Sequence, residues 1–330
     1  MNDNRIRFLV IATILGMLLT ACGSGGGGGD DNDTAGGAAE TRTVTDDFGT
    51  QVTVPVAPQR VVTTHFLLTM GTLDLGVAPV GTAVWAPANV TDRYAATLAD
   101  VPVVASQTAE PELEKIAAQS PDLILATSFN DEQVIGRLRE IAPTYVVDVS
   151  AGGANATSWS ERTSQLADVL GRTAEAGTLA SAFEQRKQQL IQTHANQING
   201  TTAAVVTGFR DDNASVFAAE SGIGQIVTSL GFTYSPQATV VAAGAQNGIA
   251  NVSFERITTS VGDAEVLFLG SDLNGGLSPV VTALQQTQLY RDLPAVRANR
   301  VGVFKPQVTG YTDANFALDQ IEQTLTGMQG

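Results

Sequence analysis

The chain contains a single cysteine, Cys22, and its position suggests a chemical role. Two arginines and an apolar run over residues 8–18 precede it, and the run leads into Leu19-Thr20-Ala21-Cys22. This order is typical of a secretory signal peptide, and the run is shorter than the roughly 20 apolar residues of a membrane-spanning helix. The tetrapeptide resembles a bacterial lipobox, in which the cysteine sulfur is acylated and becomes the new N-terminus. We therefore predict that residues 1–21 are removed and that Cys22 carries the lipid.

The segment that follows, residues 22–42, has a composition that cannot bury a core. Its first part consists mainly of Gly, Ser, Asp and Ala, residues that keep a chain flexible and solvated. Its glycines do not predict a phosphate loop, because no strand precedes them and no helix follows. We therefore expect a flexible acidic tether. Since two or three acyl chains anchor a protein durably, we expect the protein in the cell envelope, at the outer face of the cytoplasmic membrane or in the periplasm.

Charge and rare residues exclude several classes of function. The chain has 33 Asp and Glu against 18 Lys and Arg, a formal net charge of −15, and such a surface repels nucleic acid. One cysteine allows no internal disulfide and no thiolate cluster, and two histidines, His65 and His194, are too few for a multi-histidine metal site. The sequence contains no Gly-x-Ser-x-Gly, His-Glu-x-x-His or Walker motif. We therefore expect no enzyme, no catalytic residue, no metal centre and no cofactor.

Polar and aromatic residues follow several predicted strands. Because the carboxyl ends of parallel strands meet at one edge of a sheet, residues just after them line the ligand sites of α/β proteins. Aromatic rings would give a ligand flat apolar contact, and arginines, Arg210 above all, would give planar donors for anionic groups. The ligand-binding candidates are His65, Trp85, Arg93, Tyr94, Phe129, Arg210, Asn247 and Tyr311.

The elements that hold these residues follow from the hydrophobic pattern. Over residues 43–55, alternating β-branched residues flank a turn at Asp47-Phe48-Gly49, which predicts a hairpin. From 60 to 149 strands and helices alternate, with residues 85–94 expected as a loop, and this order favours a parallel sheet covered by helices. A helical pattern over 158–196, interrupted by two glycines, predicts one long helix or two.

A second alternating set of strands and helices runs from residue 203 to 325, with strands expected over 203–207, 266–269 and 301–304. The predicted fold is therefore α/β, with two lobes built on central parallel sheets, a long bridging helix and a ligand cleft between the lobes. The expected boundaries are 43–157 for the first lobe, 158–198 for the bridging helix and 199–330 for the second lobe.

Three motifs carry a resemblance to a known family. They are Asp47-Phe48-Gly49 with Pro58-Gln59-Arg60-Val61-Val62, Glu110-Pro111-Glu112-Leu113-Glu114-Lys115-Ile116 with Ser120-Pro121-Asp122-Leu123-Ile124, and Ala314-Asn315-Phe316-Ala317-Leu318-Asp319-Gln320-Ile321. In this order, over residues 43–326, the chain resembles the class III periplasmic-binding-protein family, the siderophore and vitamin B12 type of ABC-importer receptor. The resemblance implies two Rossmann-like lobes, a rigid bridging helix and limited closure around the ligand.

The resemblance also implies a function and partners. It implies a substrate-binding lipoprotein, a monomer that captures an iron–siderophore complex and delivers it to an ABC permease and its ATPase. Family members place one acidic residue on each lobe against arginines of the permease. Glu114 matches the first position; the second holds Thr228 here, and Glu220 is the substitute. Some hydroxamate-binding relatives carry an arginine where this chain has Thr108.

Haem and cobalamin receptors of the same family are the alternatives. A haem receptor would use an axial ligand in the cleft, which His65 or Tyr311 could supply. A Soret band that is lost in His65→Ala or Tyr311→Ala would indicate haem. Cobalamin receptors favour aromatic walls over arginine, so lost binding in Arg210→Ala would count against cobalamin. Metal-ion receptors share the architecture but need several converging His and carboxylate ligands.

Overall fold

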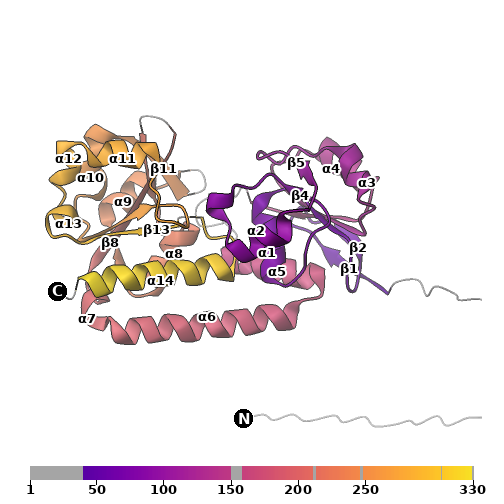
Figure 1. Ribbon diagram of the computed structural model, residues 1–330, viewed down its shortest axis with the longest axis horizontal. Coiled ribbons are helices and arrows are strands. Elements are labelled where there is room, and N and C mark those ends of the chain that lie inside the picture. The colour runs from indigo at the N-terminus through magenta and orange to yellow at the C-terminus, as the bar shows by residue number, and fades with distance from the viewer. Residues whose placement is uncertain (1–39, 150–157, 211–212, 246–247, 306, 329–330) are drawn as a thin grey trace, which may run out of the picture. The chain divides into compact units, whose positions relative to one another are not determined.

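A computed structural model describes residues 40–149, 158–210, 213–245, 248–305 and 307–328 (Figure 1). The predicted signal peptide, Cys22 and all but the last three residues of the predicted tether lie outside the described residues. Residues 39–330 form one compact unit. In the part of the chain that the structure describes, no helix is both long and apolar enough to cross a membrane.

The first described element is the predicted hairpin, which is confirmed. Strand β1 (Thr41–Thr45) pairs antiparallel with β2 (Gln51–Pro55). The buried Asp46 carboxylate accepts the backbone N–H of Thr50 at 2.8 Å, and Gly49 takes the positive φ of 75° that the turn requires. The hairpin begins two residues earlier than predicted.

The first lobe is built on short parallel strands. Strands β3 (Val61–Thr63), β6 (Leu123–Thr127) and β7 (Thr144–Val147) form one sheet in the order β3-β6-β7. Strands β4 (Thr82–Ala83) and β5 (Val103–Ala105) form a second parallel pair, which a bridge between Val62 and Gly81 joins to β3. Every residue of β6 is buried, as expected for a central parallel strand. The helices of this lobe are α1 (Phe66–Asp74), α2 (Asp92–Leu98), α3 (Leu113–Ala118) and α4 (Glu132–Arg139).

One local prediction in this lobe is wrong. Residues 85–94 were expected to form a loop, but they contain the 3-10 turn η1 (Pro87–Asn89) and the start of α2. Val90, Tyr94 and Leu98 recur every four residues and pack with Met70 and Leu73 of α1. These residues form a short apolar stripe that contains no proline. Its packing against α1 stabilises the helix.

The bridging segment is two helices in series, α5 (Trp159–Leu170) and α6 (Thr173–Thr193), followed by the short α7 (Ala195–Ile198). Ser158 and Glu161 form a capping box at the start of α5. Gly171 ends α5 at φ 68°, and a Cβ there would lie 2.4 Å from the Val56 carbonyl oxygen. The predicted break at Gly171 is therefore confirmed, whereas Gly177 lies inside α6 without interrupting it.

The second lobe has a larger, mixed sheet in the order β11-β9-β8-β12-β13, with β10 also pairing with β8. The strands are β8 (Thr202–Arg210), β9 (Asn213–Phe217), β10 (Thr233–Tyr234), β11 (Ile249–Ser253), β12 (Val266–Gly270) and β13 (Val301–Phe304). Strands β12 and β13 continue the parallel part of the sheet, as predicted, and β10, which was not predicted, also pairs parallel with β8. Strands β9 and β11 are antiparallel additions that the sequence analysis missed.

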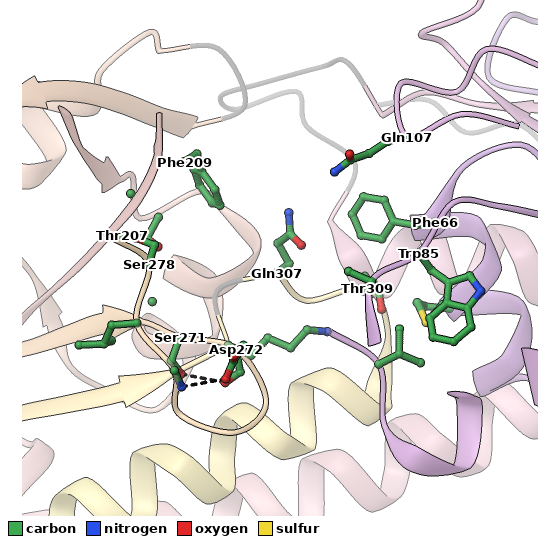
Figure 2. A pocket seen from close by; sticks show the side chains of 18 of the residues that line it. Phe66, Trp85, Gln107, Thr207, Phe209, Ser271, Asp272, Ser278, Gln307 and Thr309 are labelled. Atoms are coloured by element: carbon green, nitrogen blue, oxygen red, sulfur yellow. Dashed lines mark hydrogen bonds between the residues drawn. The ribbon is translucent and has the colours of Figure 1, made fainter. Parts of the chain in front are cut away.

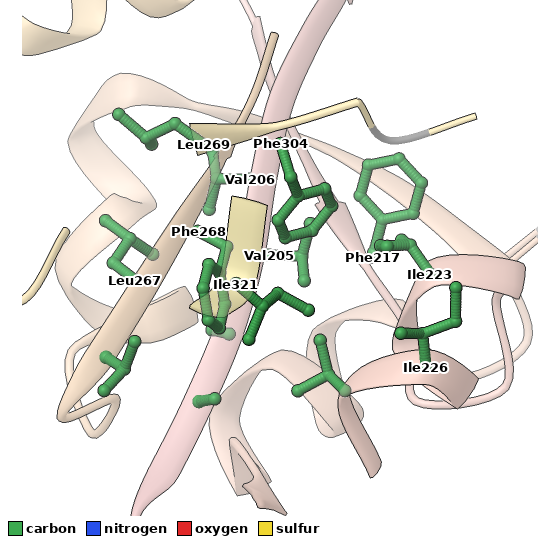
Figure 3. Close-up of a cluster of buried hydrophobic side chains, with 14 of the residues drawn as sticks. Val205, Val206, Phe217, Ile223, Ile226, Leu267, Phe268, Leu269, Phe304 and Ile321 are labelled. Carbon is green, nitrogen blue, oxygen red and sulfur yellow. The ribbon is translucent and has the colours of Figure 1, made fainter. Parts of the chain in front are cut away.

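Helices cover this sheet and enclose the largest apolar core, in which Val205, Phe268, Phe304 and Ile321 meet (Figure 3). The helices are α8 (Gly222–Ser229), α9 (Pro236–Ala242), α10 (Ile257–Val261) with the preceding 3-10 turn η4 (Phe254–Arg256), α11 (Pro279–Gln285), α12 (Gln288–Arg291), α13 (Pro294–Arg297) and α14 (Tyr311–Gly327). Helix α14 packs along α6, and Arg186 of α6 joins Asp319 of α14 at 2.9 Å (Figure 1).

A half-buried carboxylate joins the two lobes. Helix α14 begins at Gly310, which has no side chain to cap it. Asp74, from α1 of the first lobe, accepts the backbone N–H of Thr312 at 3.1 Å and also the hydroxyl of Tyr94. A helix N-terminus favours a carboxylate partner, so the first lobe supplies the cap that α14 lacks. Burial raises the pKa of Asp74 above its ordinary value, because the surroundings disfavour the charged form.

This cap generates a stability prediction. Asp74→Ala removes the acceptor of the Thr312 N–H and leaves the Tyr94 hydroxyl with Thr312 Oγ1 alone, which should lower the free energy of unfolding by about 2–3 kcal/mol. Tyr94→Phe removes the hydrogen bonds of the Tyr94 hydroxyl to Asp74 and to Thr312 Oγ1, and should cost about 1–2 kcal/mol. Asp100→Ala, at an exposed position, is the control and should stay within about 0.5 kcal/mol of wild type. Urea unfolding measures all three, and an Asp74→Ala protein as stable as the control would contradict the cap.

Candidate ligand-binding cleft

A cavity of about 440 Å³ lies between the two lobes and is lined by residues of both (Figure 2). From the first lobe its wall includes Phe66, Trp85 and Gln107. From the second lobe it includes Phe209 and Asp272 among others. A volume of this order is typical of sites that enclose a small organic molecule.

The carboxyl ends of the parallel strands position this wall. In the first lobe Phe66 follows β3, Trp85 follows β4 and Gln107 follows β5. In the second lobe Ser271 and Asp272 come directly after β12. Side chains from separate parts of the chain therefore converge because strand ends meet at one edge of each sheet.

The end of β8 also reaches the cavity, and a glycine makes this possible. A Cβ at Gly208 would lie 2.5 Å from the Cβ of Val280 in α11. The next residue, Phe209, is 49% exposed and lies 6.2 Å from the ring of Phe217. With Phe66 and Trp85 on the opposite wall (Figure 2), the cavity has aromatic rings on both sides. Such rings give flat apolar contact to a ligand.

A buried ion pair holds the third part of the wall, the segment between β13 and α14. Lys305 Nζ lies 2.5 Å from Asp313 Oδ1, and both side chains are almost fully buried. The other carboxylate oxygen accepts the backbone N–H and the hydroxyl of Thr309, at 3.1 and 2.5 Å. The Lys305 N–H donates to Gln320 at 2.8 Å. These bonds fix Lys305 and Thr309, which line the cavity together with Gln307.

Asp272 places a carboxylate on the wall of the second lobe. Its Oδ1 accepts the backbone N–H groups of Asn274 and Gly276, both at 2.8 Å. The side chain therefore closes its own turn, with Gly275 at a φ of 79°. Leu273, in this turn, donates its N–H to the carbonyl oxygen of Ala88 in the first lobe at 3.1 Å, which gives the lobes a second contact.

His65 lies behind the wall. It is 5% exposed, caps α1 by accepting the Leu67 N–H at 3.4 Å, and packs between the rings of Phe66 and Phe129, at 4.7 and 5.4 Å. Burial, and then the positive charge of Arg162, lower its pKa to about 4. Burial likewise lowers the pKa of Arg162 to about 10. His65 is thus neutral at pH 7 and supports Phe66, which does line the cavity.

The structure brings one of the predicted ligand residues to the cavity and places others elsewhere. Trp85 lines it. Arg93 is exposed on α2, and Phe129 is 47% exposed with its edge toward His65. Tyr94 is buried at the Asp74 cap. None of these three is among the described residues that line the cavity.

Tyr311 also lies away from the cavity wall. It is buried against Trp159, with ring centroids 5.0 Å apart. Asn247 lies outside the described residues, as does the side chain of Arg210, whose backbone ends β8. Ligand contact by any of the eight candidates stays a prediction.

Of the eight predicted ligand-binding residues only Trp85 lines the cavity, so the other described lining residues were missed, among them Phe209, Asp272, Lys305 and Gln307. The same strand-end rule could have found three of them, because Asp272 follows the predicted strand 266–269 and Lys305 and Gln307 follow 301–304. Phe209 was missed because β8 was expected to end at Thr207, and the structure continues it to Arg210.

The predicted docking residues lie on separate lobes. Glu114 is exposed in the first turn of α3, and Glu220 is exposed just before Ser221, the cap of α8. Their contact with a permease stays a prediction. Among the described residues, no group of three or more His, Cys, Asp and Glu side chains is placed to hold a metal ion.

The lowered pKa of His65 generates a prediction about acid stability. Between pH 6.5 and about 4 the unfolded chain binds a proton at His65 that the folded chain excludes, so acidification should lower the free energy of unfolding. The loss from pH 7 to pH 4 should be about 3 kcal/mol. His65→Asn keeps a capping acceptor and should lose that much less over the same range. Urea unfolding at both pH values tests this, and parallel losses in the two proteins would refute it.

Comparisons with known proteins agree with this architecture. A family model described as "Periplasmic binding protein" matches residues 62–308. A probable siderophore-binding lipoprotein of Bacillus subtilis is 25% identical, over 96% of this chain and 97% of its own length. An achromobactin-binding periplasmic protein of Dickeya dadantii is 28% identical, over 83% of this chain and 88% of its own.

A solved structure has the same fold. The siderophore periplasmic binding protein from the fuscachelin gene cluster of Thermobifida fusca is 31% identical, with a TM-score of 0.70 over 83% of this chain and 98% of its own. The resemblance stated from the motifs is confirmed. Because the family model covers well over half of the sequence, and the two lobes and their cleft have the matching fold, the chain belongs to the periplasmic binding protein family.

Proposed function

We propose that this protein is the substrate-binding lipoprotein of an ABC importer, which captures an iron–siderophore complex in the cleft and delivers it to the permease and its ATPase. The observation that carries the proposal is the cavity of about 440 Å³ between the lobes, with aromatic rings on both walls. The siderophore- and achromobactin-binding relatives described above support this ligand class.

The chemistry of the wall suits a chelate better than a bare ion. A siderophore surrounds iron with its own oxygen ligands, so a receptor recognises an organic surface rather than the metal. Trp85 and Phe209 offer flat apolar contact to such a surface. Gln107, Gln307 and Ser278 offer neutral donors and acceptors for its amide and carbonyl groups.

A fluorescence titration tests the ligand. The chain has two tryptophans, Trp85 at the cavity and Trp159 buried against Tyr311. Ferric siderophores should quench the emission of the Cys22→Ser protein saturably, and most of the quenching should disappear in Trp85→Phe but remain in Trp159→Phe. Trp85→Ala should weaken binding about tenfold, because it removes an aromatic contact worth about 1.4 kcal/mol.

The same titration with haem and cobalamin tests the alternatives. A response to either of these with none to ferric siderophores would replace the proposed ligand. If no ligand changes the tryptophan fluorescence, capture in this cleft would be refuted.

We also propose that the lipid on Cys22 holds the receptor at the membrane that contains its permease. Confinement raises the effective concentration of the receptor there without any new contact. Wild type should therefore fractionate with membranes, whereas Cys22→Ala should be released into the soluble fraction with its chelate affinity unchanged. Membrane fractionation with detection of the chain measures this. A Cys22→Ala protein that stays with membranes would contradict the anchor.

A further inference from the structure

The charges on the cavity wall carry information about the ligand. Of the described residues that line the cavity, two are charged, Asp272 and Lys305. A unit charge at short range in a partly desolvated cleft is one of the strongest selective forces available to a site. The partners of these two residues therefore decide which ligand charge the cleft accepts.

The positive charge is already matched. Lys305 Nζ lies 2.5 Å from Asp313 Oδ1, and the exposed fractions of the two side chains are 3% and 9%. If the ammonium turned toward a ligand, it would leave the Asp313 carboxylate buried without its cation, which is strongly unfavourable. The pair is thus neutral as a unit and has no charge left for an anionic chelate.

The negative charge has no such partner. The hydrogen bonds to the Asp272 carboxylate come from two backbone N–H groups, both on Oδ1. No cation of the described residues forms a salt bridge with Asp272, and its Oδ2 accepts no hydrogen bond from them. A half-buried carboxylate with one oxygen unengaged, on the wall of a ligand cavity, attracts a cationic group and repels an anionic one.

The rest of the wall fits the same ligand. Gln107, Gln307 and Ser278 are neutral, and the faces of Trp85 and Phe209 also attract cations. Arg210, which the sequence analysis favoured for an anionic ligand, is followed directly by Asp211 and Asp212, so that segment has a net negative formal charge.

On the basis of the proposed function, we propose that the cleft selects ferric chelates without net negative charge, and that Asp272 binds a cationic group, such as an ammonium, of the chelate. The class that fits is the trihydroxamate. Three monoanionic hydroxamates balance the charge of Fe³⁺, so an added amine makes the complex cationic. A ferric tris-catecholate, in contrast, carries a triple negative charge.

A charge series on one iron centre tests this. The probes are ferrioxamine B, a linear trihydroxamate with a free ammonium, its neutral N-acetyl derivative and its anionic N-succinyl derivative. The Cys22→Ser protein should bind the ammonium form about tenfold more tightly than the acetyl form, and the succinyl form most weakly. Added salt should narrow these differences, since the effect is electrostatic.

Asp272→Asn is the informative variant, because its side-chain oxygen can still accept the N–H groups of Asn274 and Gly276 and keep the turn. It should bring the three affinities to within about twofold of one another. Asp92→Asn, at an exposed position of α2, should keep the wild-type order. Thermal unfolding checks that both variants are folded.

The outcomes separate this inference from the proposed function. A succinyl form that binds as tightly as the ammonium form, or an order that persists in Asp272→Asn, overturns the inference. Binding of a ferric tris-catecholate with none of the three trihydroxamates overturns it and leaves the proposed function intact. Failure of every ferric chelate to bind overturns both.

Discussion

The cleft depends on the half-buried carboxylate of Asp74. Because Gly310 cannot cap α14, the N-terminus of that helix takes its partner from α1 of the other lobe, and a side chain at position 310 would collide with Asp74, at 2.2 Å from its oxygen. One hydrogen-bonded contact therefore fixes the second lobe against the first at the base of the cavity. The Leu273–Ala88 contact and the length of α6 act in the same direction. The two sets of strand ends consequently face each other across a gap whose width the fold itself determines.

Three carboxylates near the cleft have different roles because their neighbours differ. Asp74 is half-buried among neutral donors and caps a helix. Asp313 is buried against Lys305 and orders the segment that carries Gln307 and Thr309. Asp272 receives two backbone donors on Oδ1 and lines the cavity. Two of these charges thus stabilise the frame, and one is left for recognition.

The sequence predicts the frame well because the frame is made of repeated local signals. The hairpin follows from β-branched alternation around Gly49, and the end of α5 follows from Gly171. The parallel strands follow from short apolar runs between helices. Strands β9 and β11 were not predicted because only two of the five residues in each are β-branched or aromatic, although β9 forms a hairpin with β8. Helix α2 escaped because its apolar stripe acquires meaning only when α1 is beside it.

The wall of the site is less predictable from sequence, for a physical reason. The strand-end rule gives the neighbourhood of a residue but not the direction of its side chain. Trp85 and Phe209 face the cavity, whereas Tyr311 turns inward to Trp159 and Tyr94 to Asp74. A tyrosine has a hydroxyl that needs a partner when buried, and the helix cap at Asp74 supplies one for Tyr94. For Tyr94, the polar partner that holds the side chain in the core is 20 residues away in sequence, and no local pattern reveals it.

When direct contacts join the two lobes, the selectivity of the cleft depends more on the residues of its wall. A receptor that closes widely can use the free energy of closure to distinguish ligands, because only the right ligand stabilises the closed state. Where the lobes are joined at Asp74 and again at Leu273, less of that free energy is available, and shape and charge must be complementary before the ligand arrives. A single carboxylate such as Asp272 then contributes more to the selectivity for ligand charge. A chelate of the wrong charge would then meet the same unfavourable wall in the bound state.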